Sequence, residues 1–329
     1  MTNRKKMIWI LSFIWILSFG FCHSAAAQTT FDPLAIGVGA RALGMGKAYV
    51  AVAEDGDTIF TNPAGLGEID AFQFTSMSGT LLEDVGYSVF GAVYPIGGKG
   101  AIGFGYAAAR IAGIEIRDTS GTLINHAGFE NAVIFASYGR KLTDKLSLGI
   151  NLKYFKQDGT NVNAGDGTGA NLDIGLLQRG LGFLSIGAVG KNILSSNKIR
   201  YKSGEEETLP KIIKVGARMY LLGEKFRSAR FSPIELSLVV DADLSLESSE
   251  PMATHIGAEF SPTPGFTLRG GIEESAGTMG FSFRFAGVGF HYAFHPYGET
   301  SDETHYFSLS FDERGWPPEG LPDTFLSMK

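Results

Sequence analysis

Residues 145–155 read KLSLGINLKYF, and apolar side chains alternate there with polar or small ones. Successive side chains of a β-strand point to opposite faces, so strict alternation places every apolar group on one face. The apolar positions are Leu146, Leu148, Ile150, Leu152 and Tyr154. The stretch therefore predicts a strand with one continuous apolar face.

The same alternation recurs along the chain, for example in residues 213–221 and 234–244. Alternation alone is compatible with a soluble β-sandwich, whose apolar face would be the core. Several segments, however, keep the pattern for the roughly 9 to 11 residues that a membrane-crossing strand needs, whereas soluble strands usually have about 5 to 6. We therefore predict an all-β fold, a transmembrane antiparallel β-barrel of about 14 strands, an even number as in bacterial barrels. The predicted strands are 71–78, 85–95, 100–111, 128–140, 145–158, 167–178, 182–191, 209–221, 232–245, 253–261, 265–273, 278–285, 287–295 and 303–311.

The connections between these segments fit the same barrel. Short links follow the even-numbered strands, and longer links, including 112–127, 159–166 and 192–208, follow odd-numbered ones. Outer-membrane barrels have short periplasmic turns and longer external loops. We therefore expect the chain to enter the barrel from the periplasm. The exceptions are the link 222–231, which is long for a periplasmic turn, and two or three brief external loops near the C-terminus.

The first 27 residues have the layout of a secretory signal peptide. Arg4, Lys5 and Lys6 precede the apolar run 7–21, and small residues up to Ala27 offer a cleavage site. A retained membrane anchor, the alternative, would need about 20 apolar residues and a stop-transfer flank. We expect residues 1–27 to be removed on export to the bacterial outer membrane, together with Cys22.

The other end and the overall charge carry two further expectations. The predicted barrel, residues 71–311, ends on Phe311, and an aromatic final residue is typical of outer-membrane barrels. Prolines in the tail 312–329 exclude another strand, so we expect this tail to lie in the periplasm without regular structure. A net charge of −6, with no basic run interleaved with aromatics, argues against a nucleic-acid partner.

Residues 28–70 lack the alternation and contain the glycine-rich stretch 37–67, GVGARALGMGKAYVAVAEDGDTIFTNPAGLG. Small residues permit close backbone packing, and Pro63 and Gly65 interrupt any helix or strand, so the segment suits a compact filling of the barrel lumen. An ordinary periplasmic helix and turn is the plainer interpretation. A nucleotide site is disfavoured because the glycine spacing is not G-x-G-x-x-G.

This stretch resembles the N-terminal signature of the FadL-like outer-membrane family, above all its PorV/PorQ branch. The resemblance implies a fourteen-stranded barrel with an N-terminal hatch, formed here by residues 28–70. In the FadL branch it implies transport of small hydrophobic molecules, and in the PorV branch it implies a role in type IX protein secretion. The matching hatch residues are Gly39, Arg41, Gly44, Gly46, Asp55, Asn62, Pro63, Ala64 and Gly65.

Charged residues on the polar parity of the strands are candidates for lining the lumen. Because buried charges of mixed sign usually pair, a structural network that braces barrel and hatch is one interpretation, and a substrate path is the other. The candidates are Lys153, Asp173, Lys214, Arg218, Glu235, Asp241, Asp243, His255, Glu259, Arg269, Glu273, Arg284, His291 and His295.

Two classes of function follow from these patterns. A polar lumen favours a PorV-like scaffold or shuttle for exported proteins, with secretion-system proteins and cargo as partners. The alternative is a channel or carrier for small hydrophobic molecules such as fatty acids, with such a ligand, or detergent, and outer-membrane lipid as partners. An outer-membrane hydrolase is a minor alternative, but no G-x-S-x-G is present. We expect no enzyme activity, cofactor or metal, since His291 and His295 lie about 13 Å apart on a strand, too far for one ion.

Overall fold

The computed structural model describes residues 33–81, 84–160, 166–223, 234–246, 252–274, 276–296 and 304–315. The expected signal peptide, residues 28–32 of the expected hatch and most of the expected tail lie outside the described residues. No helix among the described residues is long and apolar enough to cross a membrane.

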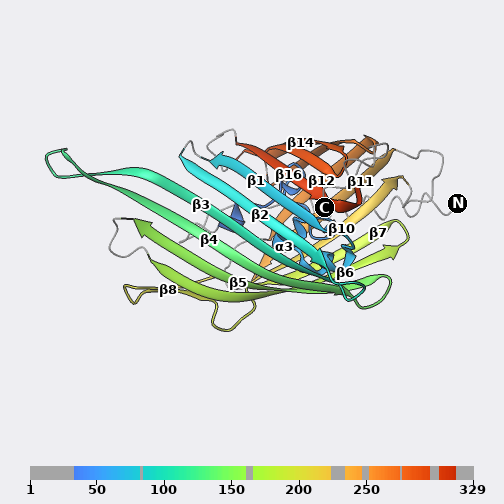
Figure 1. Ribbon diagram of the computed structural model, residues 1–329, viewed down its shortest axis with the longest axis horizontal. Coiled ribbons are helices and arrows are strands. Elements are labelled where there is room, and N and C mark those ends of the chain that lie inside the picture. The colour runs from blue at the N-terminus through green and yellow to red at the C-terminus, as the bar shows by residue number, and fades with distance from the viewer. Residues whose placement is uncertain are drawn as a thin grey trace, which may run out of the picture.

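Within the described residues, fourteen antiparallel strands close into a barrel (Figure 1). Each pairs with its neighbours in chain order, β1 pairs with β16, and β7 pairs with β10. The barrel strands are β1 (Gln73–Leu81), β2 (Val85–Pro95), β3 (Ala101–Arg117), β4 (Leu123–Lys141), β5 (Leu146–Thr160), β6 (Gly167–Leu181), β7 (Leu184–Lys191), β10 (Ile212–Leu222), β11 (Glu235–Ser245), β12 (Ala253–Thr263), β13 (Phe266–Glu273), β14 (Ala276–Phe285), β15 (Val288–Phe294) and β16 (His305–Asp312). The predicted antiparallel barrel of about 14 strands is confirmed, and every predicted strand overlaps an observed one.

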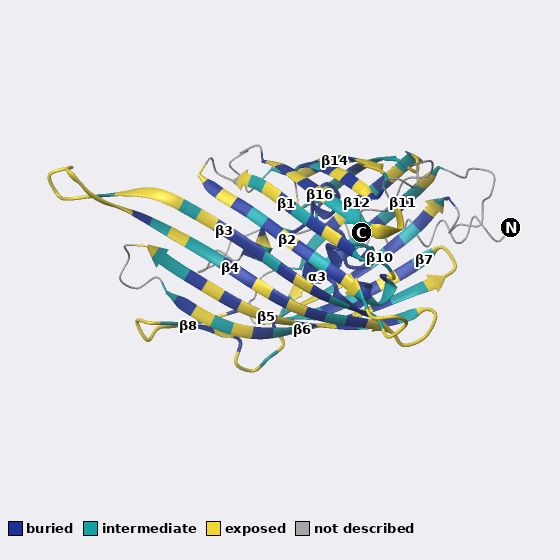
Figure 2. Cartoon of the chain, in the orientation of Figure 1, coloured by how far each residue is buried: buried dark blue, intermediate teal, exposed yellow. Residues whose placement is uncertain are grey.

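The alternation has the physical role that the sequence predicts. Along β5 the odd-numbered side chains are buried and the even-numbered ones face outward, including Ile150, Leu152 and Tyr154 (Figure 2). Large apolar side chains are exposed in the same way on other strands, for example Phe104 and Phe283. A barrel whose exposed face is this apolar has the surface that a lipid bilayer covers.

Two segments that we expected to be loops contain strands. The segment 112–127 is largely a continuation of β3 and β4, which pair at Ile114 with Ala127 and at Glu115 with His126, and the resulting arm projects beyond the barrel (Figure 1). Its β-branched residues favour extended backbone. Gly113 and Gly121, which are typical of loops, interrupt that pattern in the sequence. The segment 192–208 contains the hairpin of β8 (Lys198–Tyr201) and β9 (Glu206–Thr208), which pairs with β6 outside the closed ring.

We call the end of the barrel with the β3–β4 arm and the β8–β9 hairpin the loop end, and the opposite end the turn end. The even-numbered connections of the sequence prediction lie at the turn end, such as the one between β2 and β3. The chain also closes on itself there. Arg314, in the short helical turn η4 (Glu313–Gly315), lies 3.2 Å from Asp70, and Glu313 N–H donates to the Phe72 carbonyl. Residues 312–315 of the expected tail thus have regular structure, because they bond to residues 70–72, where the chain enters β1 beside the end of β16.

Residues 33–70 lie inside the barrel and are called the plug. The plug consists of short helical turns: η1 (Pro33–Ala35), α2 (Ala40–Leu43), α3 (Thr58–Thr61) and η2 (Pro63–Glu68). Residues 40–52, the first plug segment, contact the wall from β7 through β10 to β16. Residues 58–68, the second plug segment, contact β3 to β6. Side chains of both segments are almost entirely buried, which an isolated periplasmic turn could not achieve.

Candidate functional site

The plug rests on inward-facing glycines of the wall, which we call the glycine belt. A Cβ atom at Gly149 would lie 2.2 Å from the carbonyl group of Pro63, and one at Gly187 would lie 2.3 Å from the Val50 oxygen. Real Cβ atoms do not approach other atoms so closely, so only glycine permits this backbone contact. The belt comprises Gly103, Gly105, Gly139, Gly149, Gly175, Gly187, Gly257, Gly271 and Gly280.

Asn62 joins the two plug segments to each other and to the wall. Its side-chain nitrogen donates to the Val50 carbonyl at 2.9 Å and the Leu176 carbonyl at 3.2 Å, and its oxygen accepts from Ala64 N–H at 3.1 Å. The side chain is fully buried, and the extended backbone of Asn62, with φ of −141°, is the one favoured before proline. The chain at Asn62 and Pro63, where the sequence predicts an interruption of any helix or strand, is therefore also a contact point with β6.

A buried charge cluster attaches the plug to the opposite wall. Arg41 lies at its centre and donates to Glu54 at 2.7 Å, to Asp55 at 2.8 Å and to both carboxylate oxygens of Glu259, at 2.7 and 2.9 Å. Glu259, Arg218 and Arg269 are the wall residues of this cluster. Arg218 pairs with Glu54 of the plug at 2.8 Å, and Arg269 pairs with Glu259 at 2.8 Å. We call Arg41, Glu54, Asp55, Arg218, Glu259 and Arg269 the plug–wall cluster. Its three cations and three carboxylates satisfy one another, as buried charges must.

Asp241 provides a second polar attachment on the same wall. One of its carboxylate oxygens accepts from the main-chain N–H groups of Tyr49 and Val50, at 2.6 and 2.8 Å. Both N–H groups belong to irregular plug backbone, and burying them without an acceptor would cost free energy. The neighbouring strand leaves room for the carboxylate because Gly216 has no side chain.

Two plug carboxyls have shifted acidity. Burial, together with the charge of Asp55, raises the pKa of Asp57 to about 7, although Thr75 donates to it at 2.7 Å. Burial also disfavours ionisation of Asp55, but Arg41 and the hydrogen bond from Tyr49 hold the pKa of Asp55 below its usual value. Near neutral pH Asp55 is therefore ionised, whereas burial favours the protonated form of the neighbouring Asp57.

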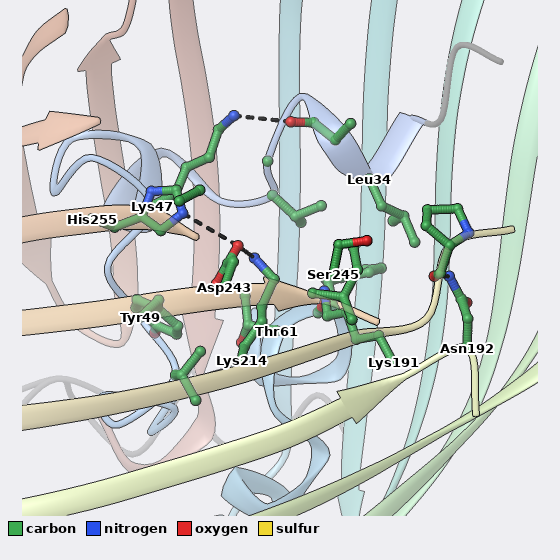
Figure 3. A pocket seen from close by; sticks show the side chains of 18 of the residues that line it. Leu34, Lys47, Tyr49, Thr61, Lys191, Asn192, Lys214, Asp243, Ser245 and His255 are labelled. Carbon is green, nitrogen blue, oxygen red and sulfur yellow. Dashed lines mark hydrogen bonds and ion pairs between the residues drawn. The ribbon is translucent and has the colours of Figure 1, made fainter. Parts of the chain in front are cut away.

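A cavity of about 400 Å³ lies between the plug and the wall toward the loop end (Figure 3). Apolar groups from the plug and from the segment before β10 form part of its lining, including Leu34, Val38, Phe60, Leu209 and Pro210. Polar groups from the wall form the rest, including Lys153, Lys191, Lys214, Asp243 and His255. The volume is in the range of small-molecule sites, and the mixed lining suits a molecule with an apolar body and a polar group.

The cations around the cavity differ in their partners. Lys153 pairs with Asp173 at 2.6 Å, Lys47 pairs with Glu273 at 2.8 Å, and Lys214 pairs with Asp243. Lys191, the last residue of β7, instead donates to the Phe60 main-chain oxygen at 3.3 Å, and no carboxylate of the described residues lies within ion-pair distance of it. Lys191 is therefore the cation of this cavity that remains able to bind an anionic ligand.

The structure brings most of the sequence-predicted charged residues together in three groups. Arg218, Glu259 and Arg269 belong to the plug–wall cluster, and Asp241 holds the plug backbone. The residues of the cavity wall and of the shell behind it are Lys153, Asp173, Lys214, Asp243, His255, Glu273 and His295, the last of which bonds Glu273 at 2.5 Å. Glu235 and Arg284 do not join them, because they lie at the turn end, where both are exposed.

The hatch-motif residues also have defined places. Arg41 and Asp55 lie in the plug–wall cluster, and Asn62, Pro63 and Ala64 lie against β5 and β6. Glycines of the motif meet the wall or the plug itself. Gly46 contacts the backbone of Ile272, Gly44 contacts Gly280, Gly39 lies against Asp57, and Gly65 lies against Thr58.

Sequence reasoning missed Lys47, Glu54, Arg179 and Lys191. Lys191 has the inward parity of β7, so the alternation could have found it, whereas plug residues follow no period. Arg179 donates to the carbonyls of Val52 and Ala53, at 2.6 and 3.1 Å. No parity rule predicts such a contact between a strand end and an irregular segment.

His291 does not line the cavity. Its ring nitrogens bond Ser282 at 2.6 Å and Ser310 at 2.8 Å, and all three side chains lie among the strands away from the cavity. A hydrolase would need substrate access to such a serine. Among the described residues, no three His, Cys, Asp or Glu side chains are grouped so as to hold a metal ion.

Comparison with known proteins shows similarity of fold. No protein-family model and no curated protein sequence matches the chain. Among solved structures, the Ralstonia pickettii toluene transporter TbuX is 15% identical with a TM-score of 0.55, and 84% of this chain covers 98% of that one. The CymD monoaromatic hydrocarbon channel is 14% identical with a TM-score of 0.57, covering 86% and 98% of the two chains. A Pseudomonas aeruginosa FadL homologue is 11% identical with a TM-score of 0.50, covering 82% and 97%.

Proposed function

We propose that this protein lies in the bacterial outer membrane and binds small amphipathic molecules in the cavity beside its plug, as a step in carrying them across that membrane. The observation that carries the proposal is the cavity itself, with an apolar side formed by Phe60, Val38 and Leu209. At Lys191 it also has a cation that pairs with no carboxylate among the described residues. The apolar outer surface and the fold shared with barrels named as toluene and monoaromatic hydrocarbon transporters support it.

The lining favours a ligand that is more than a plain hydrocarbon. A purely apolar molecule would desolvate Lys191 and the neighbouring ion pairs without replacing their hydrogen bonds, which is costly. A carboxylate at Lys191 would supply the missing partner, while an acyl or aromatic body would contact Phe60 and Leu209. We therefore expect an amphipathic acid, such as a fatty acid, to bind better than a neutral molecule of the same size.

A matched pair of ligands and a matched pair of variants test this. Binding of a fatty acid and of its methyl ester is measured by calorimetry on the purified, detergent-solubilised full chain. We expect Lys191→Met to weaken binding of the acid by about tenfold, and to change binding of the ester little, because only the acid loses an ion pair. Lys99→Met, at an exposed position between β2 and β3, is the control. Equal effects on acid and ester, or no binding of either, would refute the proposal.

A role in protein export, implied by the PorV/PorQ resemblance, is the second candidate. One observation favours it: the glycine belt brings plug and wall backbones into direct contact, as expected of a barrel that stays closed. Crosslinking in cells tests it, since an export scaffold should be recovered with secretion components and exported cargo. Recovery of neither, in a strain that has such a secretion system, would eliminate this candidate.

A further inference from the structure

Two side chains at the end of β11, Asp243 and Ser245, line the cavity and each has a polar atom without a partner (Figure 3). The Oγ atom of Ser245 is buried and has no hydrogen-bond partner among the described residues. The same holds for the Oδ1 atom of Asp243, because Lys214 and His255 both bond to its other oxygen, Oδ2. Polar atoms that are buried without a partner cost free energy, so both oxygens would gain from a new hydrogen bond.

Their place beside the cavity distinguishes these atoms from other unpartnered ones. Ser185 of β7 also has a buried Oγ atom without a partner among the described residues, but it does not line the cavity. Ser245 and Asp243 do line it, although the two oxygens themselves are covered. A serine hydroxyl turns among three staggered positions, and the carboxylate torsion of aspartate is broad. Side-chain rotation can therefore bring both oxygens to a ligand in the cavity.

A hydroxyl is the chemical group that suits this pair. The charge of Asp243 is already balanced by its ion pair with Lys214, so its second oxygen favours a neutral donor over a further cation. A carboxylate only accepts hydrogen bonds, whereas a hydroxyl both donates and accepts them. One hydroxyl of a ligand can therefore donate to Asp243 and accept from Ser245.

The cation of the cavity, Lys191, lies in the same row of inward side chains as Ser245. Lys191 of β7 pairs with Ile212 of β10, and Ile212 pairs with Ser245 of β11. Adjacent strands lie about 4.8 Å apart, so the Cα atoms of Lys191 and Ser245 are roughly 10 Å apart across the wall. The long side chain of Lys191 can span part of that distance. A ligand whose carboxylate binds Lys191 therefore needs only a few carbon atoms to place a hydroxyl at Ser245.

We propose that Asp243 and Ser245 form a hydroxyl-binding subsite of the cavity, and that its ligand is an amphipathic acid with a hydroxyl a few carbons from the carboxylate. The carboxylate binds Lys191, and the apolar chain contacts Phe60 and Leu209. This inference rests on the proposed function and adds the substrate class to it. An acid without the hydroxyl binds Lys191 in the same way but leaves the two oxygens of β11 without a partner.

Dodecanoate, 3-hydroxydodecanoate, 5-hydroxydodecanoate and 12-hydroxydodecanoate are the probes, and their binding to the purified full chain in detergent is measured by calorimetry. We expect the 3-hydroxy or the 5-hydroxy acid to bind about three- to tenfold more tightly than dodecanoate, which is the effect of one or two hydrogen bonds. The 12-hydroxy acid should show no such gain, because its hydroxyl lies at the far end of the chain from the carboxylate.

Three variants assign the gain to the subsite. Ser245→Ala should abolish it and leave the affinity for dodecanoate unchanged, whereas Ser245→Thr, which keeps a hydroxyl, should retain it. Ser185→Ala is the matched control, since it removes an equally unpartnered oxygen away from the cavity, and it should retain the gain. Because the Ser245 Oγ atom has no partner among the described residues, Ser245→Ala should not lower the temperature at which the barrel loses its compact gel mobility.

The outcomes separate this inference from the proposed function. If dodecanoate binds and neither the 3-hydroxy nor the 5-hydroxy acid binds more tightly, the hydroxyl subsite is refuted and the proposed function stands. An equal gain for the 12-hydroxy acid, or a gain that persists in Ser245→Ala, would also overturn the subsite, because the hydroxyl would then bind elsewhere. Binding of none of the four acids would refute both.

Discussion

Replacing Arg41 with methionine should loosen the plug without unfolding the barrel. The substitution removes the plug's ion pairs with Glu259, which together involve contacts of 2.7 and 2.9 Å, and its pairs with Glu54 and Asp55. Breaking a buried ion pair by removing one partner costs about 3 to 5 kcal/mol. The lower end applies here, because Arg269 still pairs with Glu259 and Arg218 still pairs with Glu54. A loss of about 3 kcal/mol raises the equilibrium population of the state in which the plug is detached from the wall by roughly 150-fold.

The assay is thiol labelling of a cysteine introduced at a buried plug position. Ala64 is fully buried, so Ala64→Cys, in a chain whose Cys22 is replaced by serine, should react with a maleimide only when the plug leaves β5 and β6. We expect Arg41→Met to raise the labelling rate by about a hundredfold. Arg117→Met, on the exposed arm, should leave it unchanged. A labelling rate for Arg41→Met within twofold of the parent chain, with the barrel intact by gel mobility, would refute the argument that the plug–wall cluster holds the plug.

Two further perturbations test the seat of the plug. Gly149→Ala should raise the same labelling rate and lower the temperature at which the barrel loses its compact gel mobility, because its Cβ would meet the Pro63 carbonyl group, whereas Gly277→Ala, with open space around it, should do neither. Raising the pH from 5 to 8 should increase the labelling rate by roughly ten- to a hundredfold relative to the rate of the unfolded chain at the same pH, a ratio that removes the titration of the thiol itself. A folded-state pKa of about 7 for Asp57, above its ordinary value, contributes stability at low pH that is lost as the pH rises through 7. Asp57→Asn should remove that pH dependence, and a dependence that persists would refute its assignment to Asp57.

The barrel was largely predictable because its signal is local. In residues 145–155 the polarity of each residue indicates which face of the strand it lies on. Apolar and polar residues alternate wherever lipid covers one side of the strand and the lumen lies on the other. The alternation did not reveal the β3–β4 arm, in which Ile114 and Ile124 are exposed. A two-stranded ribbon that projects beyond the barrel needs no apolar face, so its sequence does not have to alternate. The β8–β9 hairpin was missed for a related reason, since its strands are too short to show a period.

The candidate site was predictable only in part. Parity placed Glu259, Arg269 and Asp241 on the inner face, and the motif singled out Arg41 and Asn62, but no pattern indicated which wall residue meets which plug residue. Parity alone also placed Glu235 and Arg284 with the interior charges, because it says nothing about depth along the barrel. Both lie at the open turn end, where water and not protein surrounds a charge.

The sequence by itself determined the strands, their faces and the presence of an irregular glycine-rich segment before them, because each of these is a property of residues close together in the chain. Only the tertiary structure decided that Gly149 meets Pro63, that Arg41 meets Glu259 across 218 positions, and that Lys191 lines a cavity in which no carboxylate of the described residues lies within ion-pair distance of it. Those contacts depend on the number of strands, their tilt and their stagger around the closed barrel. The stagger sets the height of every inward side chain relative to the plug, and no local pattern encodes it.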